Sequence, residues 1–258
     1  MNPAIDLSRF GISSERLRGT VVSHSLTGPR LILLFGERHT IRAGIKAHLL
    51  NALTLFDSGR ISCVGVEGWK DSSEPVPCQL IVELFKNQQA QHGNNDEAII
   101  EGTLRGYRPQ NYAFWKILTL LRPGLRIRSV EDPTMFQRAG HVSRTTVEDR
   151  ISNIATFLSR SALPFAQMSP SSLTQEQEQT IIECKAITQA MEEFAEDDLN
   201  YQRDEAFIEN MRILWDEAEP DKPAILNAGV SHQYRIARRL RTDSALCNEY
   251  SHILLEQP

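Results

Sequence analysis

Four short runs of aliphatic and β-branched residues constrain this chain more than any other feature of its sequence. Each run stops at a glycine or an acidic residue: Leu31–Phe35 at Gly36, Ile61–Val66 at Glu67, Leu125–Val130 at Glu131, and Ala224–Ala228 at Gly229. The first and last runs are almost continuously apolar, which is typical of strands buried on both faces of a parallel sheet. Two flanking segments, Thr20–Ser23 and Ser251–Leu255, are expected to form further strands near the sheet edges.

Segments with apolar residues at helical spacing separate these runs. They are Ile41–Leu55, Asn111–Leu121, Gln175–Phe194 and Tyr201–Glu217. Strands that alternate with helices pair in parallel through crossover connections. The stretch from about 138 to 198 contains no convincing strand and is interpreted as a helical insertion. We therefore predict one α/β domain over residues 1–258, with a mainly parallel central sheet flanked by helices.

Composition and charge limit the partners that this chain is expected to have. The net charge of −5 disfavours nucleic-acid binding, and the arginines at 235, 238, 239 and 241 are interpreted as a solvated helix end. The N-terminus has no signal-peptide pattern, and no stretch reaches the roughly 18 to 20 apolar residues of a membrane span. The four cysteines are too widely spaced for a zinc motif. We expect a cytoplasmic protein with a small-molecule or peptide substrate, and with neither nucleic acid nor membrane as partner.

Ionisable side chains follow each of the four runs within a few residues. They are Glu37 and His39, then Glu67, then Glu131 with Asp132, and finally His232. The carboxyl ends of parallel strands share one edge of the sheet, where such folds bind ligands. Two imidazoles and several carboxylates at one edge suit proton transfer or divalent metal binding. The other histidines (His24, His48, His92, His141 and His252) are interpreted as surface or structural residues.

Two of the four runs are followed by the same pattern, G-x-x-H, at the expected turn from strand to helix. These segments are Gly36 to His39 and Gly229 to His232. The glycine permits a tight turn, and the helix that follows offers free N–H groups to an anion or oxyanion. A histidine at such a turn suits the role of base or ligand near neutral pH. Taken singly, the glutamates are also compatible with structural roles.

Three further residues are candidates for lining a substrate site. Arg105 and Tyr107 lie in a basic, aromatic segment ahead of the helix expected near Asn111, and Trp69 follows Glu67. A plain turn and plain packing are the alternatives for these residues.

The stretch Leu31 to Trp69, with LILLFGERH and VGVEGW, resembles the opening of the superfamily that unites erythromycin esterases, haem-binding ChaN-like proteins and Tiki/TraB-type metalloproteases. RDEAFIENM, from Arg203 to Met211, and AGVSH, ending at His232, resemble its C-terminal part. Residues 70–200 match only loosely. Only one residue separates Glu37 from His39, and this spacing is closer to that of the ChaN-like and Tiki-like forms. The resemblance implies functional roles for His39, Glu67, Arg203 and His232, with Glu37 beside them.

The leading hypothesis is a hydrolase that acts on an ester or amide bond. His39 would be the general base, and Glu67 would orient an imidazole or act as a second acid or base. His232 would donate to the oxyanion or leaving group, and Arg203 would hold a carboxylate or the oxyanion.

Three alternatives stay open. A divalent metal held by His39, Glu67 and His232 would make a Tiki-type peptidase. The ChaN-like resemblance implies a haem-binding protein. The same residues would also serve a lyase, isomerase or epimerase.

Overall fold

The computed structural model describes residues 5–13, 17–37, 41–67, 77–107, 113–132, 134, 174–175 and 201–256. The chain divides into two compact units, Met1–Glu131 with Ala206–Pro258, and Asp132–Glu205. The helical insertion expected at about 138–198 lies, apart from residues 174–175, outside the described residues. The insertion and the single-domain organisation therefore stay predictions.

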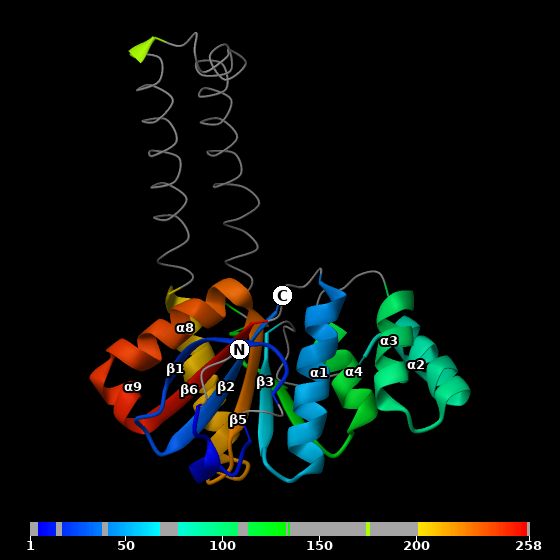
Figure 1. Ribbon diagram of the computed structural model, residues 1–258, viewed down its shortest axis with the longest axis horizontal. Coiled ribbons are helices and arrows are strands. Elements are labelled where there is room, and N and C mark those ends of the chain that lie inside the picture. The colour runs from blue at the N-terminus through cyan, green and yellow to red at the C-terminus, as the bar shows by residue number, and fades with distance from the viewer. Residues whose placement is uncertain are drawn as a thin grey trace. The chain divides into compact units, whose positions relative to one another are not determined.

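The described part of the first unit is built on a six-stranded sheet (Figure 1). Its strands are β1 (Thr20–Ser25), β2 (Arg30–Glu37), β3 (Cys63–Val66), β4 (Arg126–Ser129), β5 (Ala224–Gly229) and β6 (Tyr250–Glu256). The spatial order is β1-β6-β2-β5-β3-β4, and each neighbouring pair is parallel except β1 with β6. This confirms the predicted α/β class with a mainly parallel sheet. Each of the six expected runs forms a strand.

The order of the strands brings distant parts of the sequence together at one edge. β5 lies between β2 and β3, although it follows both of them in the chain. The register pairs Glu37 with Gly229 and Val66 with Asn227. The carboxyl ends of β2, β5 and β3 therefore lie side by side.

Helices of the first unit pack on the sheet or on one another (Figure 1). They are α1 (Arg42–Asp57), α2 (Gln79–His92), α3 (Asp96–Gly106), α4 (Ala113–Leu121), α8 (Val230–Thr242) and α9 (Ser244–Glu249), with a 3-10 turn η1 (Ser8–Phe10). A further helix runs over residues 201–216, and its residues from 206 onward belong to the first unit. The helices expected at 41–55, 111–121 and 201–217 are thus found, whereas α2 and α3 were not predicted. No helix among the described residues has the length and apolar character of a membrane span.

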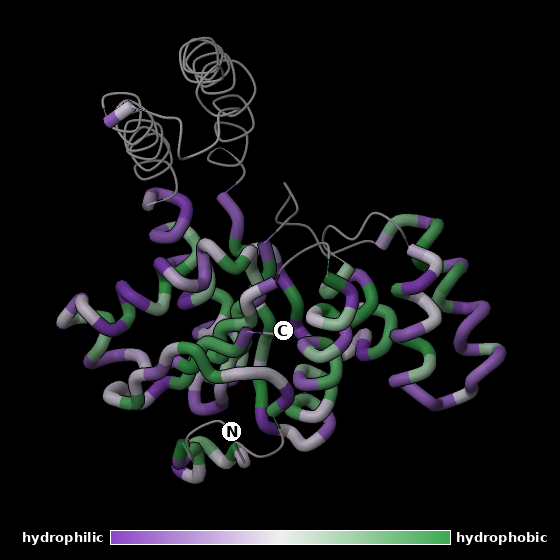
Figure 2. Tube along the Cα trace, turned by 45° about the horizontal axis from the view of Figure 1, so that its top comes forward, coloured by the Kyte–Doolittle hydropathy of each residue, from purple (hydrophilic) through white to green (hydrophobic). Residues whose placement is uncertain are grey.

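Alternate residues of β2 face two separate hydrophobic cores. Leu33 and Phe35 belong to one core with apolar residues of α1, α3 and α4. Ile32 and Leu34 belong to another with residues of α8 and the 201–216 helix. Successive side chains of a strand point to opposite faces, so both faces of the sheet are covered. Figure 2 shows the result, with hydrophobic residues along the strands and many hydrophilic residues on the outer helices.

Gly65 in β3 permits close packing just before the strand ends. A Cβ at this position would lie 2.5 Å from the Sδ of Met211 and 2.6 Å from the Cγ1 of Val130. Neither group could keep its place beside a larger residue, because core side chains are already close-packed. The absence of a side chain at Gly65 therefore allows the helix that carries Met211 to pack closely against β3.

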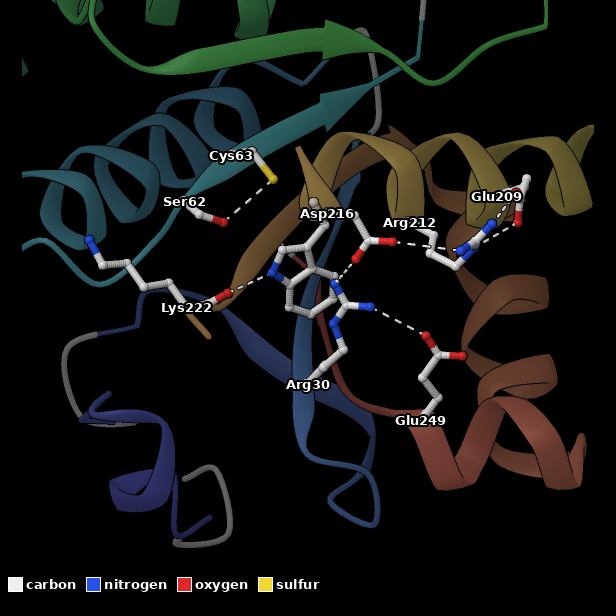
Figure 3. A network of polar contacts seen from close by, with 9 residues as sticks. Arg30, Ser62, Cys63, Glu209, Arg212, Asp216, Lys222 and Glu249 are labelled. Atoms are coloured by element: carbon white, nitrogen blue, oxygen red, sulfur yellow. Dashed lines mark hydrogen bonds and ion pairs between the residues drawn. The ribbon is translucent and has the colours of Figure 1, made fainter. Parts of the chain in front are cut away.

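A charged network lies at the opposite, amino-terminal ends of the strands (Figure 3). Arg30, the first residue of β2, forms ion pairs with Asp216 and with Glu249, the latter at 3.3 Å. Its guanidinium also lies 4.5 Å from the centre of the Trp215 ring. Asp216 is shared with Arg212, 3.6 Å away. These contacts tie the start of β2 to the 201–216 helix and to α9, which is a structural role.

Candidate active site

Glu67, the residue directly after β3, is held against the start of α8. Its backbone N–H donates to the carbonyl of Asn227 at 2.9 Å, and its Oε2 accepts from the backbone N–H of Gly229 at 2.6 Å. The residue is only 8% exposed. Gly229 is the N-cap of a 13-residue helix, where the helix dipole favours a negative charge. Glu67 therefore stabilises the beginning of α8.

His232 lies in the first turn of α8 and is buried, with 5% of its surface exposed. Its Nε2 lies 3.8 Å from Oε1 of Glu67. Its Nδ1 lies 3.0 Å from Nη2 of Arg235, one turn further along the helix. The Phe207 ring is tilted against the imidazole, with the ring centres 5.0 Å apart. The imidazole is thus held between a carboxylate, a guanidinium and an aromatic ring.

Two more carboxylates lie at the same edge of the sheet. Glu37 is the last residue of β2 and is 2% exposed, and Glu131 follows β4 and is 4% exposed. The backbone N–H of Glu131 donates to the hydroxyl of Ser129 at 3.1 Å. The fold therefore places Glu37 at the end of β2, Glu67 directly after β3 and Glu131 shortly after β4, as the spacing along the chain predicted.

Buried amide side chains fix the backbone beneath this edge. Gln233 donates through Nε2 to the carbonyl of Leu226 at 2.7 Å, and Asn227 donates to the carbonyl of Phe35 at 3.4 Å. Both residues are almost fully buried. They tie β5 and the start of α8 to β2. Sequence reasoning missed both, because an amide near a strand end has no pattern that distinguishes it from a surface residue.

His48 supports the end of β2 from the other face of the sheet. Its Nε2 lies 3.2 Å from the carbonyl of Gly36, and its ring stacks on Phe35 with the ring centres 4.8 Å apart. A carbonyl only accepts, so Nε2 is the donor. Complete burial lowers the pKa of His48 from 6.5 to about 4, which keeps the ring neutral. This position agrees with the structural role that the sequence suggested.

The remaining predicted site residues are not joined to the Glu67–His232 pair by the geometry described. His39 and Trp69 lie outside the described residues. Arg203 lies on the 201–216 helix within the second unit, so its role stays a prediction. The contacts of Arg105 and Tyr107 are local: Arg105 lies 3.6 Å from Glu101, and the hydroxyl of buried Tyr107 accepts from Lys116 at 3.0 Å.

The described residues contain no group of three or more histidine, cysteine, aspartate or glutamate side chains arranged to hold a metal ion. Glu67 and His232 are two members of the expected ligand set, and His39 is the third. A metal bound by these three residues, and the haem alternative, stay predictions.

The fold and this edge define the chain as an α/β protein with a buried carboxylate–imidazole pair at the carboxyl ends of its parallel strands. Comparisons with protein-family models, curated proteins and solved structures find no match for it. The resemblance to the superfamily of erythromycin esterases, ChaN-like and Tiki-type proteins therefore stays a prediction from the motifs at the two ends of the chain.

Proposed function

We propose that this protein is an enzyme with an acid–base site at Glu67 and His232, and that it hydrolyses an ester or amide bond. One observation carries the proposal: the carboxylate directly after β3 and the imidazole in the first turn of α8, both buried, come within 3.8 Å at the edge of the sheet where such folds bind ligands. Burial of ionisable groups is costly, so such pairs are concentrated at functional sites.

The distance between the two groups suits a proton-transfer role. At 3.8 Å the pair is longer than a normal hydrogen bond, and a small movement brings Glu67 and His232 into contact. Catalytic hydrogen bonds are often long without substrate and tighten when it binds. The buried setting also strengthens any interaction with charge that develops on a substrate.

The proposed roles follow the order of the chain. His39, which the sequence places two residues beyond the end of β2, is the general base that activates water. His232 donates to the oxyanion or leaving group, and Glu67 orients an imidazole or acts as a second acid or base. The sequence resemblance adds Glu37 to this set and gives Arg203 the role of binding a substrate carboxylate or the oxyanion. Glu131, Arg105, Tyr107 and Trp69 are proposed to contact a small-molecule or peptide substrate.

Hydrolysis of a panel of p-nitrophenyl esters and p-nitroanilides tests this proposal. We expect Glu67→Gln, His232→Asn and His39→Ala each to lower kcat/KM by about 100-fold or more, the usual worth of a general acid or base. Glu83→Gln and His92→Asn make the same chemical changes on the exposed side of α2 and should leave the rate unchanged.

The possible outcomes separate the site from the reaction. An active wild type whose rate survives all three substitutions would refute the site. A wild type that cleaves no ester or amide would refute the reaction class. Circular dichroism of each variant is needed, because Glu67 also stabilises the start of α8.

A second candidate function is removal of a proton next to a carbonyl group, as in a lyase, isomerase or epimerase. The supporting observation is that the Glu67 carboxylate faces Nε2 of His232. A carboxylate base opposite a neutral imidazole that polarises a carbonyl suits this chemistry. Incubating carbonyl acids in deuterated water, followed by mass spectrometry, distinguishes the two, since exchange without addition of water indicates proton abstraction.

A further inference from the structure

The contact between Arg235 and His232 determines where the imidazole carries its proton. Nη2 of Arg235 lies 3.0 Å from Nδ1 of His232. The residues are three apart on α8 and therefore share one face of the helix. A guanidinium has donors only, so Nδ1 must accept with its lone pair. The proton of the neutral ring is then on Nε2, the nitrogen that faces Glu67.

We propose that Arg235 is a positioning residue that holds His232 in the Nε2–H tautomer, so that His232 acts as a hydrogen-bond donor and not as a metal ligand. The donor role rests on the proposed function, whereas the tautomer is a property of the protein without substrate. Sequence reasoning assigned Arg235 to a solvated basic helix end, and the structure instead places its guanidinium on the imidazole.

The same contact argues against a metal ion on His232. A histidine that binds a metal through Nε2 carries its proton on Nδ1 and usually donates that proton to a carboxylate or carbonyl. At Nδ1 of His232 this proton would meet the N–H groups of Arg235. The ligand set of His39, Glu67 and His232 therefore does not fit this arrangement of α8.

The tautomer also suits the chemistry of an oxyanion. Hydrogen bonds polarise one another in a buried setting, so a guanidinium at Nδ1 makes the N–H at Nε2 a stronger donor. Donors that are oriented before the reaction stabilise negative charge at little cost in reorganisation. Arg235 would thus make His232 a stronger hydrogen-bond donor to the oxyanion without contacting the substrate itself.

Nuclear magnetic resonance of the wild-type protein labelled with ¹³C and ¹⁵N tests the inference directly. The ring nitrogens of His232 are assigned through bonds from its Cβ, and their shifts show which one carries hydrogen at pH 8. We expect a protonated Nε2 and an unprotonated Nδ1. A ring with its proton on Nδ1, or with both nitrogens protonated, would overturn the inference.

Zinc titration of variants provides the second measurement. Arg235→Glu replaces the donor by an acceptor, so the proton should move to Nδ1 and zinc affinity should rise by about tenfold to a hundredfold. Arg238→Glu makes the same change in charge at an exposed position on the same helix and is the control. It should change neither the tautomer of His232 nor the zinc affinity. Zinc binding by the wild type that His232→Asn abolishes would contradict the proposal.

The two proposals can fail separately. If the tautomer is as expected but no ester or amide is cleaved, the inference about Arg235 stands and the proposed hydrolysis fails. If hydrolysis depends on His232 while its proton is on Nδ1, the proposed hydrolysis stands and the inference about Arg235 fails. The wild-type spectrum decides the tautomer even if Arg235→Glu does not fold.

Discussion

Burial of His48 should make the folded protein lose stability in mild acid. The imidazole is fully buried, and its pKa in the folded protein is lowered from 6.5 to about 4 because burial disfavours the charged form. Between these two values the unfolded chain binds a proton that the folded protein does not. The free energy of unfolding therefore falls as the pH falls from about 6.5 towards 4.

The size of this effect follows from the difference between the two pKa values. One pKa unit corresponds to about 1.4 kcal/mol, so a shift from 6.5 to about 4 is worth about 3 kcal/mol in full. Between pH 7 and pH 5, linkage gives a loss of about 2 kcal/mol from this residue alone. His252, whose pKa burial also lowers to about 4, should add a similar loss.

Urea unfolding at pH 7 and pH 5, followed by tryptophan fluorescence, measures the loss. His48→Gln keeps a donor for the carbonyl of Gly36 but removes the titrating group, so its loss on acidification should be about 2 kcal/mol smaller than that of the wild type. Contributions of the carboxylates are common to both proteins. His92→Gln changes an exposed imidazole and serves as the control. An equal loss in wild type and His48→Gln would refute the reasoning.

Three further outcomes are expected. Gly65→Ala should lower the free energy of unfolding by about 1–3 kcal/mol in the same urea assay, because its methyl group would lie 2.5 Å from Met211; an unchanged midpoint would contradict this packing. Arg30→Met should cost about 1–2 kcal/mol, since two ion pairs and a ring contact are lost while the partner carboxylates stay partly hydrated. Ellman's reagent should label exposed Cys78 well before Cys63, because burial raises the pKa of the Cys63 thiol to about 11. Peptide mass mapping of the labelled native protein identifies which cysteine has reacted, and labelling of Cys63 before Cys78 would contradict this prediction.

The strands could be predicted because each one is encoded locally. β2 and β5 are buried on both faces, so their runs are almost continuously apolar and end where glycine or charge begins. α1 and α4 likewise turn a broad apolar face to the core. α2 was missed because it buries only Ile81 and Phe85 in 14 residues, which leaves too little apolar periodicity to recognise.

The positions of Glu37, Glu67, Glu131 and His232 at strand ends were also visible along the chain, since a strand end depends on neighbouring residues alone. Their grouping at one edge followed from the general geometry of parallel sheets. That geometry does not determine which of these side chains are in contact. Contact between Glu67 and α8 requires β5 to insert between β2 and β3, and strand order depends on packing summed over the whole chain.

The role of Arg235 shows the same division most clearly. Along the sequence it is one of four arginines near a helix end, and its spacing of three from His232 puts both on one helix face without showing whether that face is buried. In the folded protein the rotation of α8 turns the face of His232 and Arg235 inward and leaves Arg238 exposed. Local sequence specified the strands, the helices and the residues at their ends. Tertiary packing selected the strand order and the face of α8 that is buried, because both depend on contacts that only the complete core brings together.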